Sequence, residues 1–322
     1  MPIIRQKYKK LGYSNKVITV LMKGWRIKTK KQYQVYLKKW ILYCNKRKWE
    51  PDVYNIMNCV KFLMHLYKEQ LSYSAINTAR SALSALFDEP PVGEHSTIKR
   101  FMRGIFNTRP NKPRYVKIWD VSVVLRYLDK CAPAHELTLR QLTMKVVTLC
   151  ALVTAQRCQT LHAMNLDFCD IGSTSASFNI REVLKHNTPN NNKNEVILPS
   201  YPNNKRLCVV TYLKKYIKRT QPFRKSQKLF LSYQAPHHPV SKDTISRWIK
   251  STLLKAGINT STFKAHSTRA AATSAVTQQV DLTSILKAAG WTNCRTFATY
   301  YNKKVEGARE KTKFGRAVLG KK

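Results

Sequence analysis

The stretch "FKAHSTRAAATSAVTQQ", residues 263–279, places a histidine and an arginine at the start of a run of small residues. We expect a helix here, with His266 and Arg269 three residues apart and therefore on one side of its first turn. The amino end of a helix attracts phosphate groups. The small residues that follow allow such a helix to lie deep against its neighbours. The stretch therefore predicts a buried helix that presents an imidazole and a guanidinium to an anion.

Further polar residues follow the same pattern along the chain. Arg157 comes directly after an apolar helix, in "VTAQRCQTL", and Lys185 lies near the end of "ASFNIREVLKH", the first of two expected strands. The segment "AAGWTNCRTFATYYNK", residues 288–303, adds Trp291 and the adjacent Tyr300 and Tyr301. A short His-x-x-Arg motif alone is a weak signal, but these residue types in this order are a much stronger one.

This set of side chains fits the cleavage of a phosphodiester without a metal ion. Arg157 and Arg269 can bind the non-bridging phosphate oxygens with the fork geometry of a guanidinium. A tyrosine that becomes attached to the cut strand conserves the energy of the phosphodiester bond, so that rejoining needs no ATP. A base for the tyrosine proton and an acid for the leaving oxygen complete the chemistry. The pattern predicts an enzyme that breaks and rejoins DNA.

From about residue 23 to residue 305, the chain resembles the tyrosine recombinases, a phage integrase-like family. Within that family it resembles the recombinases of eukaryotic DIRS-like and Crypton-like mobile elements. The resemblance rests on four segments: "LTLRQLTMKVVTLCALVTAQRCQTL", "PVSKDTISRWIK", "FKAHSTRAA" and "AAGWTNCRTFATYYNK".

The resemblance implies a role for each of these side chains. His266 would be the base, Lys185 the acid, and Trp291 a donor to a phosphate oxygen that also packs beside the nucleophile. It further implies a helical SAM-like core-binding domain and a catalytic domain that close as a C-shaped clamp on duplex DNA. Four protomers on two DNA sites would then act through 3′-phosphotyrosyl intermediates and a Holliday junction, with no cofactor.

Two positions depart from this pattern or leave it open. Many relatives carry an acidic residue three positions after the first arginine, where this chain has Thr160. The support of Arg157 must therefore differ. Lys193, in the Asn-rich loop "NTPNNNKN", is an alternative acid, but Lys185 is favoured because it directly follows a strand pattern.

The spacing after Trp291 leaves two nucleophiles open. Tyr300 lies nine residues after Trp291 and Tyr301 ten. Nine is the spacing of many bacterial and phage relatives. The mobile-element pattern, in which an aromatic residue precedes the nucleophile, implies Tyr301 as nucleophile and Tyr300 as a packing residue.

The charge of the chain points to a polyanionic partner. Its 58 Lys and Arg against 17 Asp and Glu give a formal net charge of +41, which favours a nucleic acid bound over a broad surface. No acidic residue precedes Glu50. The segment "RIKTKKQYQVYLKKW" predicts an amphipathic helix with a basic face, which we expect to contact the DNA backbone through its lysines: Lys28, Lys30, Lys31, Lys38 and Lys39.

Hydrophobic periodicity predicts a mainly α protein with one small β-hairpin, in which residues 176–186 and 194–200 are the strands. The Pro-rich, basic stretch near residues 107–117 predicts a linker. We therefore expect a basic segment at 1–22, a helical DNA-binding domain at 23–110, a linker at 111–117 and a catalytic domain at 118–322. Ser72 or Ser74 and Ser96 are expected helix caps.

Other protein classes fit the sequence less well. The eight cysteines are scattered singly, without metal-ligand or disulfide spacing, so we expect no metal. The chain lacks a secretory signal and a long apolar stretch, and we expect an intracellular protein without a membrane. The cluster "NKRK", residues 45–48, is compatible with import into the nucleus. Three alternative functions are a domesticated, non-catalytic DNA-binding protein, a type IB topoisomerase-like nickase and an RNA-packaging protein.

Overall fold

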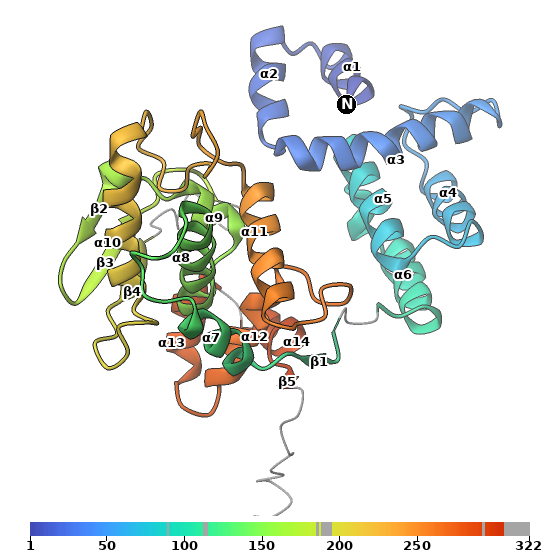
Figure 1. Ribbon diagram of the computed structural model, residues 1–322. Coiled ribbons are helices and arrows are strands. Elements are labelled where there is room, and N and C mark those ends of the chain that lie inside the picture. Colours follow the sequence, from blue (N-terminus) through green and yellow to red (C-terminus); the bar gives the residue numbers. More distant parts are fainter. Residues whose placement is uncertain (89, 112–114, 185–186, 188–194, 292–293, 306–322) are drawn as a thin grey trace, which may run out of the picture. The chain divides into compact units, whose positions relative to one another are not determined.

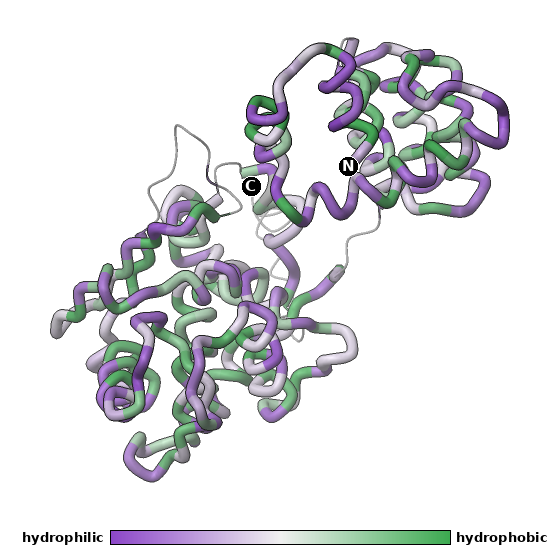
Figure 2. Tube along the Cα trace, turned by 90° about the horizontal axis from the view of Figure 1, so that it is seen from above, coloured by the Kyte–Doolittle hydropathy of each residue, from purple (hydrophilic) through white to green (hydrophobic). Residues whose placement is uncertain are grey.

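The computed structural model covers residues 1–322 and describes all of them except 89, 112–114, 185–186, 188–194, 292–293 and 306–322. The chain divides into two compact units, Met1–Pro113 and Arg114–Lys322 (Figure 1). Each unit has its own hydrophobic core. Apolar and hydrophilic residues alternate along the helices of both (Figure 2), as expected for helices that bury one face.

The regular elements in the described part of the first unit are all helices. Its elements are α1 (Pro2–Lys10), α2 (Asn15–Lys23), α3 (Ile27–Asn45), α4 (Ile56–Lys68), α5 (Tyr73–Leu86), η1 (Val92–Glu94) and α6 (Ser96–Thr108). Polar side chains at the helix starts accept backbone N–H groups that otherwise lack a partner. Ser72 caps α5 as expected. The expected cap at Ser96 is wrong, because the Nδ1 atom of His95 accepts the N–H of Thr97, so that His95 is the cap and Ser96 is the first residue of α6.

The core of the first unit forms around Trp40 of α3. Its ring meets Phe62 edge to face at a centroid distance of 5.3 Å, and it meets Phe87 at 6.3 Å. Ile4 of α1 and Ile18 of α2 are fully buried in the same cluster. Residues 1–22, expected as a basic segment, thus form two helices that pack with the rest of this unit.

The second unit is mainly helical, with short strands. Its elements are β1 (Lys117–Ile118), α7 (Val121–Lys130), α8 (Leu139–Thr154), α9 (Cys158–Ala163), η2 (Leu166–Phe168), β2 (Cys169–Ile171), β3 (Ser175–Asn179), β4 (Glu195–Pro199), α10 (Val209–Thr220), η3 (Gln221–Phe223), α11 (Lys242–Lys255), α12 (Ser267–Val276), α13 (Leu282–Ala289), α14 (Cys294–Tyr300) and β5 (Lys304–Val305). Helix α8 lies in the middle, almost wholly buried, as its apolar sequence predicts.

The sheet confirms the expected antiparallel pairing and extends it. Strand β3 pairs with β4 in the register Asn179↔Glu195 to Ser175↔Pro199, and β2 adds a third strand on the other side of β3. The first strand was predicted to run to residue 186, which is too long. It ends at Asn179, which pairs with Glu195, the first residue of β4. The fold therefore confirms the predicted mainly α class with a small sheet.

A second, parallel pair was not predicted. Strand β1 pairs with β5 in the register Lys117↔Lys304 and Ile118↔Val305. Each strand has two residues, too few for a period-2 pattern to be recognised in the sequence. The pair joins the start of the second unit to the segment that follows α14.

None of the helices in the described part of the chain is long and apolar enough to cross a membrane.

Candidate active site

Arg157 is placed by a sharp turn between α8 and α9. Helix α8 ends at Thr154, and Ala155 adopts a left-handed conformation with φ of 48°. Such a conformation costs a residue with a Cβ about 1–2 kcal/mol. The chain then becomes extended at Arg157, which precedes the first residue of α9. Arg157, which was predicted to follow a buried helix, thus lies in a strained turn that redirects the chain.

Helix α12 carries the predicted His and Arg in different environments. His266 is the N-cap residue and is exposed, whereas Arg269 in the first turn is 1% exposed. Ser267 between them is buried and its hydroxyl accepts the indole N–H of Trp119 at 2.8 Å. The amino end of α12 is therefore held by the start of the second unit, with the imidazole at the surface and the guanidinium beneath it.

Arg269 lies among aromatic rings and backbone carbonyls. Its Nη2 donates to the carbonyl of Ala289 at 3.0 Å, at the end of α13. Its guanidinium carbon lies 4.7 Å from the ring centre of Trp291 and 5.4 Å from that of Tyr301. Burial, together with the nearby positive charge of Arg157, lowers the pKa of the Arg269 guanidinium to about 10. It remains a cation at neutral pH.

Tyr301, and not Tyr300, is directed toward these groups. The Tyr301 hydroxyl is hydrogen-bonded to Nε2 of His266 at 2.9 Å. Its ring packs on Trp291 with a centroid distance of 4.4 Å, and Phe297 packs on Trp291 in turn at 5.6 Å. Tyr300, the last residue of α14, is 60% exposed. The structure therefore brings together the predicted His266, Arg269, Trp291 and Tyr301.

Several buried N–H groups of this cluster have no hydrogen-bond acceptor among the described residues. They are Arg157 Nη1, Arg269 Nε, Arg269 Nη1 and Trp291 Nε1. A buried donor without a partner costs roughly 1–3 kcal/mol. Such a concentration of donors, with the charge of Arg157 close enough to lower the pKa of Arg269, suits an anion with several oxygen acceptors.

Two supporting residues were missed by the sequence reasoning. Gln156, next to Arg157, is buried and its Nε2 donates to the carbonyl of Ala288 at 2.7 Å. The Ser274 hydroxyl donates to the Tyr301 carbonyl at 2.7 Å and accepts the N–H of Lys303 at 3.0 Å. Both contacts join residues far apart in the chain, so no spacing motif marks them.

Thr160, which stands where many relatives carry an acidic residue, is buried in α9. Gln156 and Arg269 bind the successive carbonyls at the end of α13, a contact that links the Arg157 turn to the Arg269 cluster without a carboxylate. Lys185 and Lys193, the two candidates for the acid, lie outside the described residues.

The five lysines expected to face DNA do not all lie on one side of α3. At about 100° per residue, Lys28, Lys31, Lys38 and Lys39 share a face, and all four are exposed. Lys30 points about 80° away from the nearest of them, next to the side that buries Leu37, and is half-buried. Lys39 also forms an ion pair with Glu69 at 3.1 Å. The shared face therefore consists of four of the five predicted lysines.

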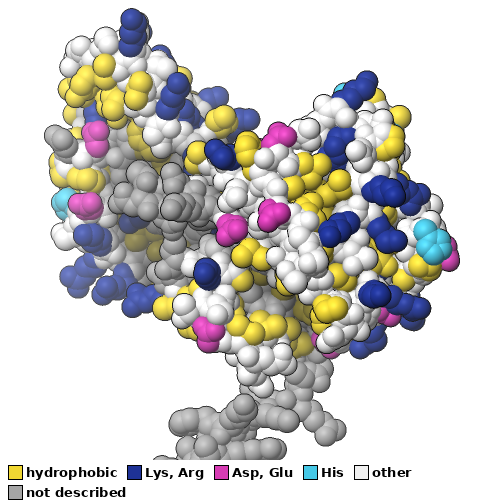
Figure 3. Space-filling model, turned by 90° about the vertical axis from the view of Figure 1, so that its left-hand side faces the viewer, with side chains coloured by type: hydrophobic (Ala, Val, Ile, Leu, Met, Phe, Trp, Pro, Cys, Tyr) yellow, Lys and Arg dark blue, Asp and Glu magenta, His cyan; other side chains and the backbone are white. Residues whose placement is uncertain are grey.

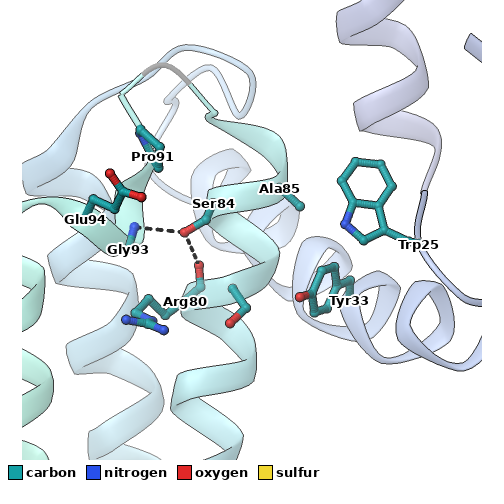
Figure 4. Close-up of a pocket in the computed structure, with 9 residues that line it drawn as sticks. Trp25, Tyr33, Arg80, Ser84, Ala85, Pro91, Gly93 and Glu94 are labelled. Carbon is teal, nitrogen blue, oxygen red and sulfur yellow. Dashed lines mark hydrogen bonds between the residues drawn. The ribbon is translucent and has the colours of Figure 1, made fainter. Parts of the chain in front are cut away.

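A pocket of about 530 Å³ lies within the first unit and is lined by none of the predicted site residues. Trp25 and Tyr33 line it on one side and Arg80 of α5 on the other (Figure 4). The N–H of Gly93 donates to the Ser84 hydroxyl at 2.8 Å, and a side chain at position 93 would meet that oxygen at 3.0 Å. The glycine thus permits a close contact between η1 and α5.

No group of three or more His, Cys, Asp and Glu side chains in the described part of the chain is arranged to hold a metal ion. The cysteines that the structure describes are unpaired thiols. Burial raises the pKa of the Cys150 thiol to about 12 and that of Cys158 to about 11. These thiols are protonated at neutral pH and pack as apolar groups.

The chain matches two protein families. Residues 122–306 match the phage integrase family, and residues 20–89 match the N-terminal SAM-like domain of phage integrases. No curated protein matches the sequence.

Solved structures of low sequence identity share the fold. A lambda integrase dimer bound to a COC′ core site is 16% identical, with 97% of this chain and 98% of that chain covered and a TM-score of 0.55. The Tn1549 transposon integrase in complex with transposon right end DNA is 13% identical, with 84% and 85% covered and a TM-score of 0.55. The XerH site-specific recombinase bound to a palindromic difH substrate is 13% identical, with 76% and 67% covered and a TM-score of 0.54.

Proposed function

The chain belongs to the phage integrase family, and we propose that it is a site-specific tyrosine recombinase that cuts and rejoins double-stranded DNA through a 3′-phosphotyrosyl intermediate. One observation carries the proposal: the Tyr301 hydroxyl is hydrogen-bonded to His266 at 2.9 Å, beside buried guanidinium donors that suit a phosphate. A nucleophile within reach of a base is the geometry that such chemistry requires.

In the first step, the Tyr301 oxygen attacks the phosphorus of the scissile phosphodiester. His266 takes the phenolic proton through the hydrogen bond that it already makes. The bond between the phosphorus and the 5′ oxygen breaks, and the leaving oxygen takes a proton from an acid. We assign that acid to Lys185, with Lys193 as the alternative. The 3′ phosphate is then bound to Tyr301, and attack by another 5′ hydroxyl reverses each of these transfers.

The guanidinium groups of Arg157 and Arg269 hold the non-bridging oxygens and stabilise the charge that develops on the phosphorane. Their N–H groups are buried and oriented before substrate binds, so little reorganisation accompanies the reaction. Trp291 supplies a further buried N–H, and its ring packs on Tyr301. This arrangement uses charge and hydrogen bonds in the place where other nucleases use metal ions.

The charge of the protein supports DNA as the substrate. Lys and Arg side chains are spread over the face shown in Figure 3, where they outnumber the acidic side chains. In the first unit, the shared lysine face of α3 suits a phosphate backbone, where Lys and Arg displace condensed counterions. The α3 lysines would bind the DNA backbone, and the second unit would cut and rejoin the strands.

The proposal extends to assembly and biological context. Four protomers on two DNA sites would exchange strands through a Holliday junction, as the recombinase resemblance implies. An origin in a mobile element accords with the resemblance to DIRS-like and Crypton-like recombinases, and we propose that the protein acts on DNA in the nucleus.

The test is adduct formation on suicide DNA substrates in the presence of EDTA, resolved on a denaturing gel. The substrates carry a nick next to the cleavage position, so that the released fragment diffuses away and the adduct accumulates. A metal-independent covalent adduct supports the recombinase. Tight binding without an adduct on any substrate would favour the domesticated DNA-binding protein, and relaxation of supercoils by a monomer without synapsis would favour the nickase.

A further inference from the structure

We propose that Ser274 is the positioning residue that holds Tyr301 at the attacking distance, by fixing the backbone of residues 301–303 to helix α12. This inference rests on the proposed function of Tyr301 as nucleophile. It concerns a residue that touches neither the phosphate nor the tyrosine hydroxyl, and that acts only through the tyrosine backbone.

The Ser274 hydroxyl uses both of its hydrogen-bonding capacities on one short segment. It donates to the carbonyl of Tyr301 at 2.7 Å and accepts the N–H of Lys303 at 3.0 Å. These contacts place the serine across the turn that ends α14, where the N–H groups of Tyr301 and Asn302 both bond to the carbonyl of Phe297 at 2.9 Å. The turn is thereby closed on one side by its own backbone and on the other by Ser274.

The segment joins a short helix to the two-residue strand β5, and an anchor between these two elements fixes the backbone of the tyrosine itself. Helix α14 has seven residues, and helices this short are not stable by themselves in water. The hydroxyl of Tyr301 meets His266 at an exposed position. A tyrosine held only at its tip and by ring packing would sample several backbone positions. Displacements of about 1 Å in a reacting group can lower a rate about a hundredfold.

One rigid element sets both ends of the nucleophile. Ser274 and His266 are eight residues apart, about 12 Å along the axis of α12 at 1.5 Å per residue. The tyrosine therefore lies along α12, with its carbonyl at Ser274 and its hydroxyl at His266. Arg269, which lies between them in the chain, faces the ring. Helix α12 therefore sets the distance from the nucleophile to the base His266 and to the guanidinium of Arg269.

The test compares Ser274→Ala, Ser274→Thr and Thr277→Ala. Thr277 follows on the same helix and donates only to helix carbonyls, those of Thr273 and Ser274, so it is a matched loss of a hydroxyl without contact to the tyrosine segment. We expect the single-turnover rate of adduct formation at saturating DNA to fall at least tenfold in Ser274→Ala. Ser274→Thr should stay within about twofold of the parent, because it keeps the hydroxyl that makes both contacts. Thr277→Ala should also stay within about twofold, because the hydroxyl that it removes makes no contact with the tyrosine segment.

A second readout does not depend on activity. With 3-fluorotyrosine incorporated at position 301 alone, ¹⁹F NMR of the protein reports the ring environment. Ser274→Ala should broaden or shift this signal, with DNA affinity unchanged and a fall in melting temperature no larger than that of Thr277→Ala, while Thr277→Ala leaves the signal as it is.

The outcomes separate this inference from the proposed function. An unchanged adduct rate together with an unchanged fluorine signal in Ser274→Ala would overturn the positioning role and leave the recombinase intact. No adduct in the parent protein, with a fluorine signal that still responds to Ser274→Ala, would overturn the proposed function and support the anchor. Equal losses in Ser274→Ala and Thr277→Ala would show general destabilisation of α12 and would also overturn the positioning role.

Discussion

The imidazole Nε2 of His266 lies 2.9 Å from the hydroxyl of Tyr301, although the two residues are 35 positions apart in the chain. The contact forms within one chain, from the N-cap of α12 to the residue after α14. A base and a nucleophile are thus already paired before any DNA is bound, and the pairing distinguishes Tyr301 from its exposed neighbour Tyr300.

The adduct test can assign the nucleophile. Tyr301→Phe should abolish the covalent adduct, because the hydroxyl bonded to His266 is lost. Tyr300→Phe should retain adduct formation within about threefold, since that side chain is 60% exposed and exposed positions contribute little. The measurement is the adduct yield of each variant on the same suicide substrate. Loss of the adduct only in Tyr300→Phe would move the nucleophile by one residue.

A substrate with a sulfur in place of the scissile 5′ oxygen can identify the acid. A thiolate is a far better leaving group than an alkoxide and needs no proton. The slow cleavage expected for Lys185→Ala should therefore recover on the sulfur substrate, whereas that of His266→Ala should not. General acid catalysis contributes about 10²- to 10⁴-fold, which sets the size of the recovery. Recovery in Lys193→Ala instead would assign the acid to that lysine.

An inorganic anion should stabilise the protein through the two guanidinium groups. Orthovanadate at about 100 times its dissociation constant would add roughly 2.7 kcal/mol to the free energy of unfolding, seen as a higher melting temperature. Arg269→Met should remove this response. Lys145→Met removes another buried cation and is the control, in which the response should persist. An equal shift in Arg269→Met would place the anion elsewhere.

The buried Lys145 predicts how stability depends on pH. Its Nζ donates to the carbonyl of Cys131 at 2.6 Å and lies 3.7 Å from the ring centre of Tyr212. Burial lowers its pKa from 10.5 in the unfolded chain to about 8. Between these values the unfolded state binds more protons, so Lys145 makes the free energy of unfolding rise as the pH increases from about 8 to 10.5.

Urea unfolding at pH 7 and pH 10 measures this contribution. The gain in unfolding free energy between these two pH values should be smaller in Lys145→Met than in the parent protein. An equal gain in both proteins would show that the folded-state pKa of Lys145 is not lowered.

The shared lysine face of α3 predicts a salt dependence of DNA binding. Each phosphate contact contributes about 0.9 to the slope of log affinity against log salt. Replacing Lys28, Lys31 and Lys38 together with Ala should therefore lower that slope by roughly 2.7, with equal losses on unrelated sequences. Lys30→Ala, on a different side of the helix, should leave the slope unchanged. The measurement is fluorescence anisotropy over a range of NaCl concentrations.

The sequence predicted the residue types of the site better than their arrangement. Order along the chain selected Arg157, His266, Arg269, Trp291 and Tyr301 as candidates, and the structure brings the last four of them into contact. The choice of Tyr301 over Tyr300 also accords with the observed contact to His266. The division between a buried Arg269 and an exposed His266 was not predicted, because it depends on the elements that pack around the end of α12.

Contacts between distant segments could not be predicted. Ser274 lies five residues after Arg269 in a run of small residues, and nothing in that run separates it from Thr273, which bonds to its own helix. Gln156 is similar, since its partner is a backbone carbonyl on α13. Strands β1 and β5 are too short to leave a pattern. Helix geometry places the five predicted lysines on two sides of α3, which a count of basic residues does not reveal because it ignores their angle around the axis.

The parallel pairing of β1 with β5 has a consequence for how the second unit can be engineered. It holds Lys117 beside Lys304, and neighbouring strands lie about 4.8 Å apart, so the first and last strands in the described part of this unit lie side by side. Domains whose ends adjoin tolerate circular permutation and insertion into a host protein. A version of residues 117–305 with β1 and β5 joined by a linker and new termini opened at an exposed loop should retain its fold, and it could be inserted as a single module into an unrelated DNA-binding protein.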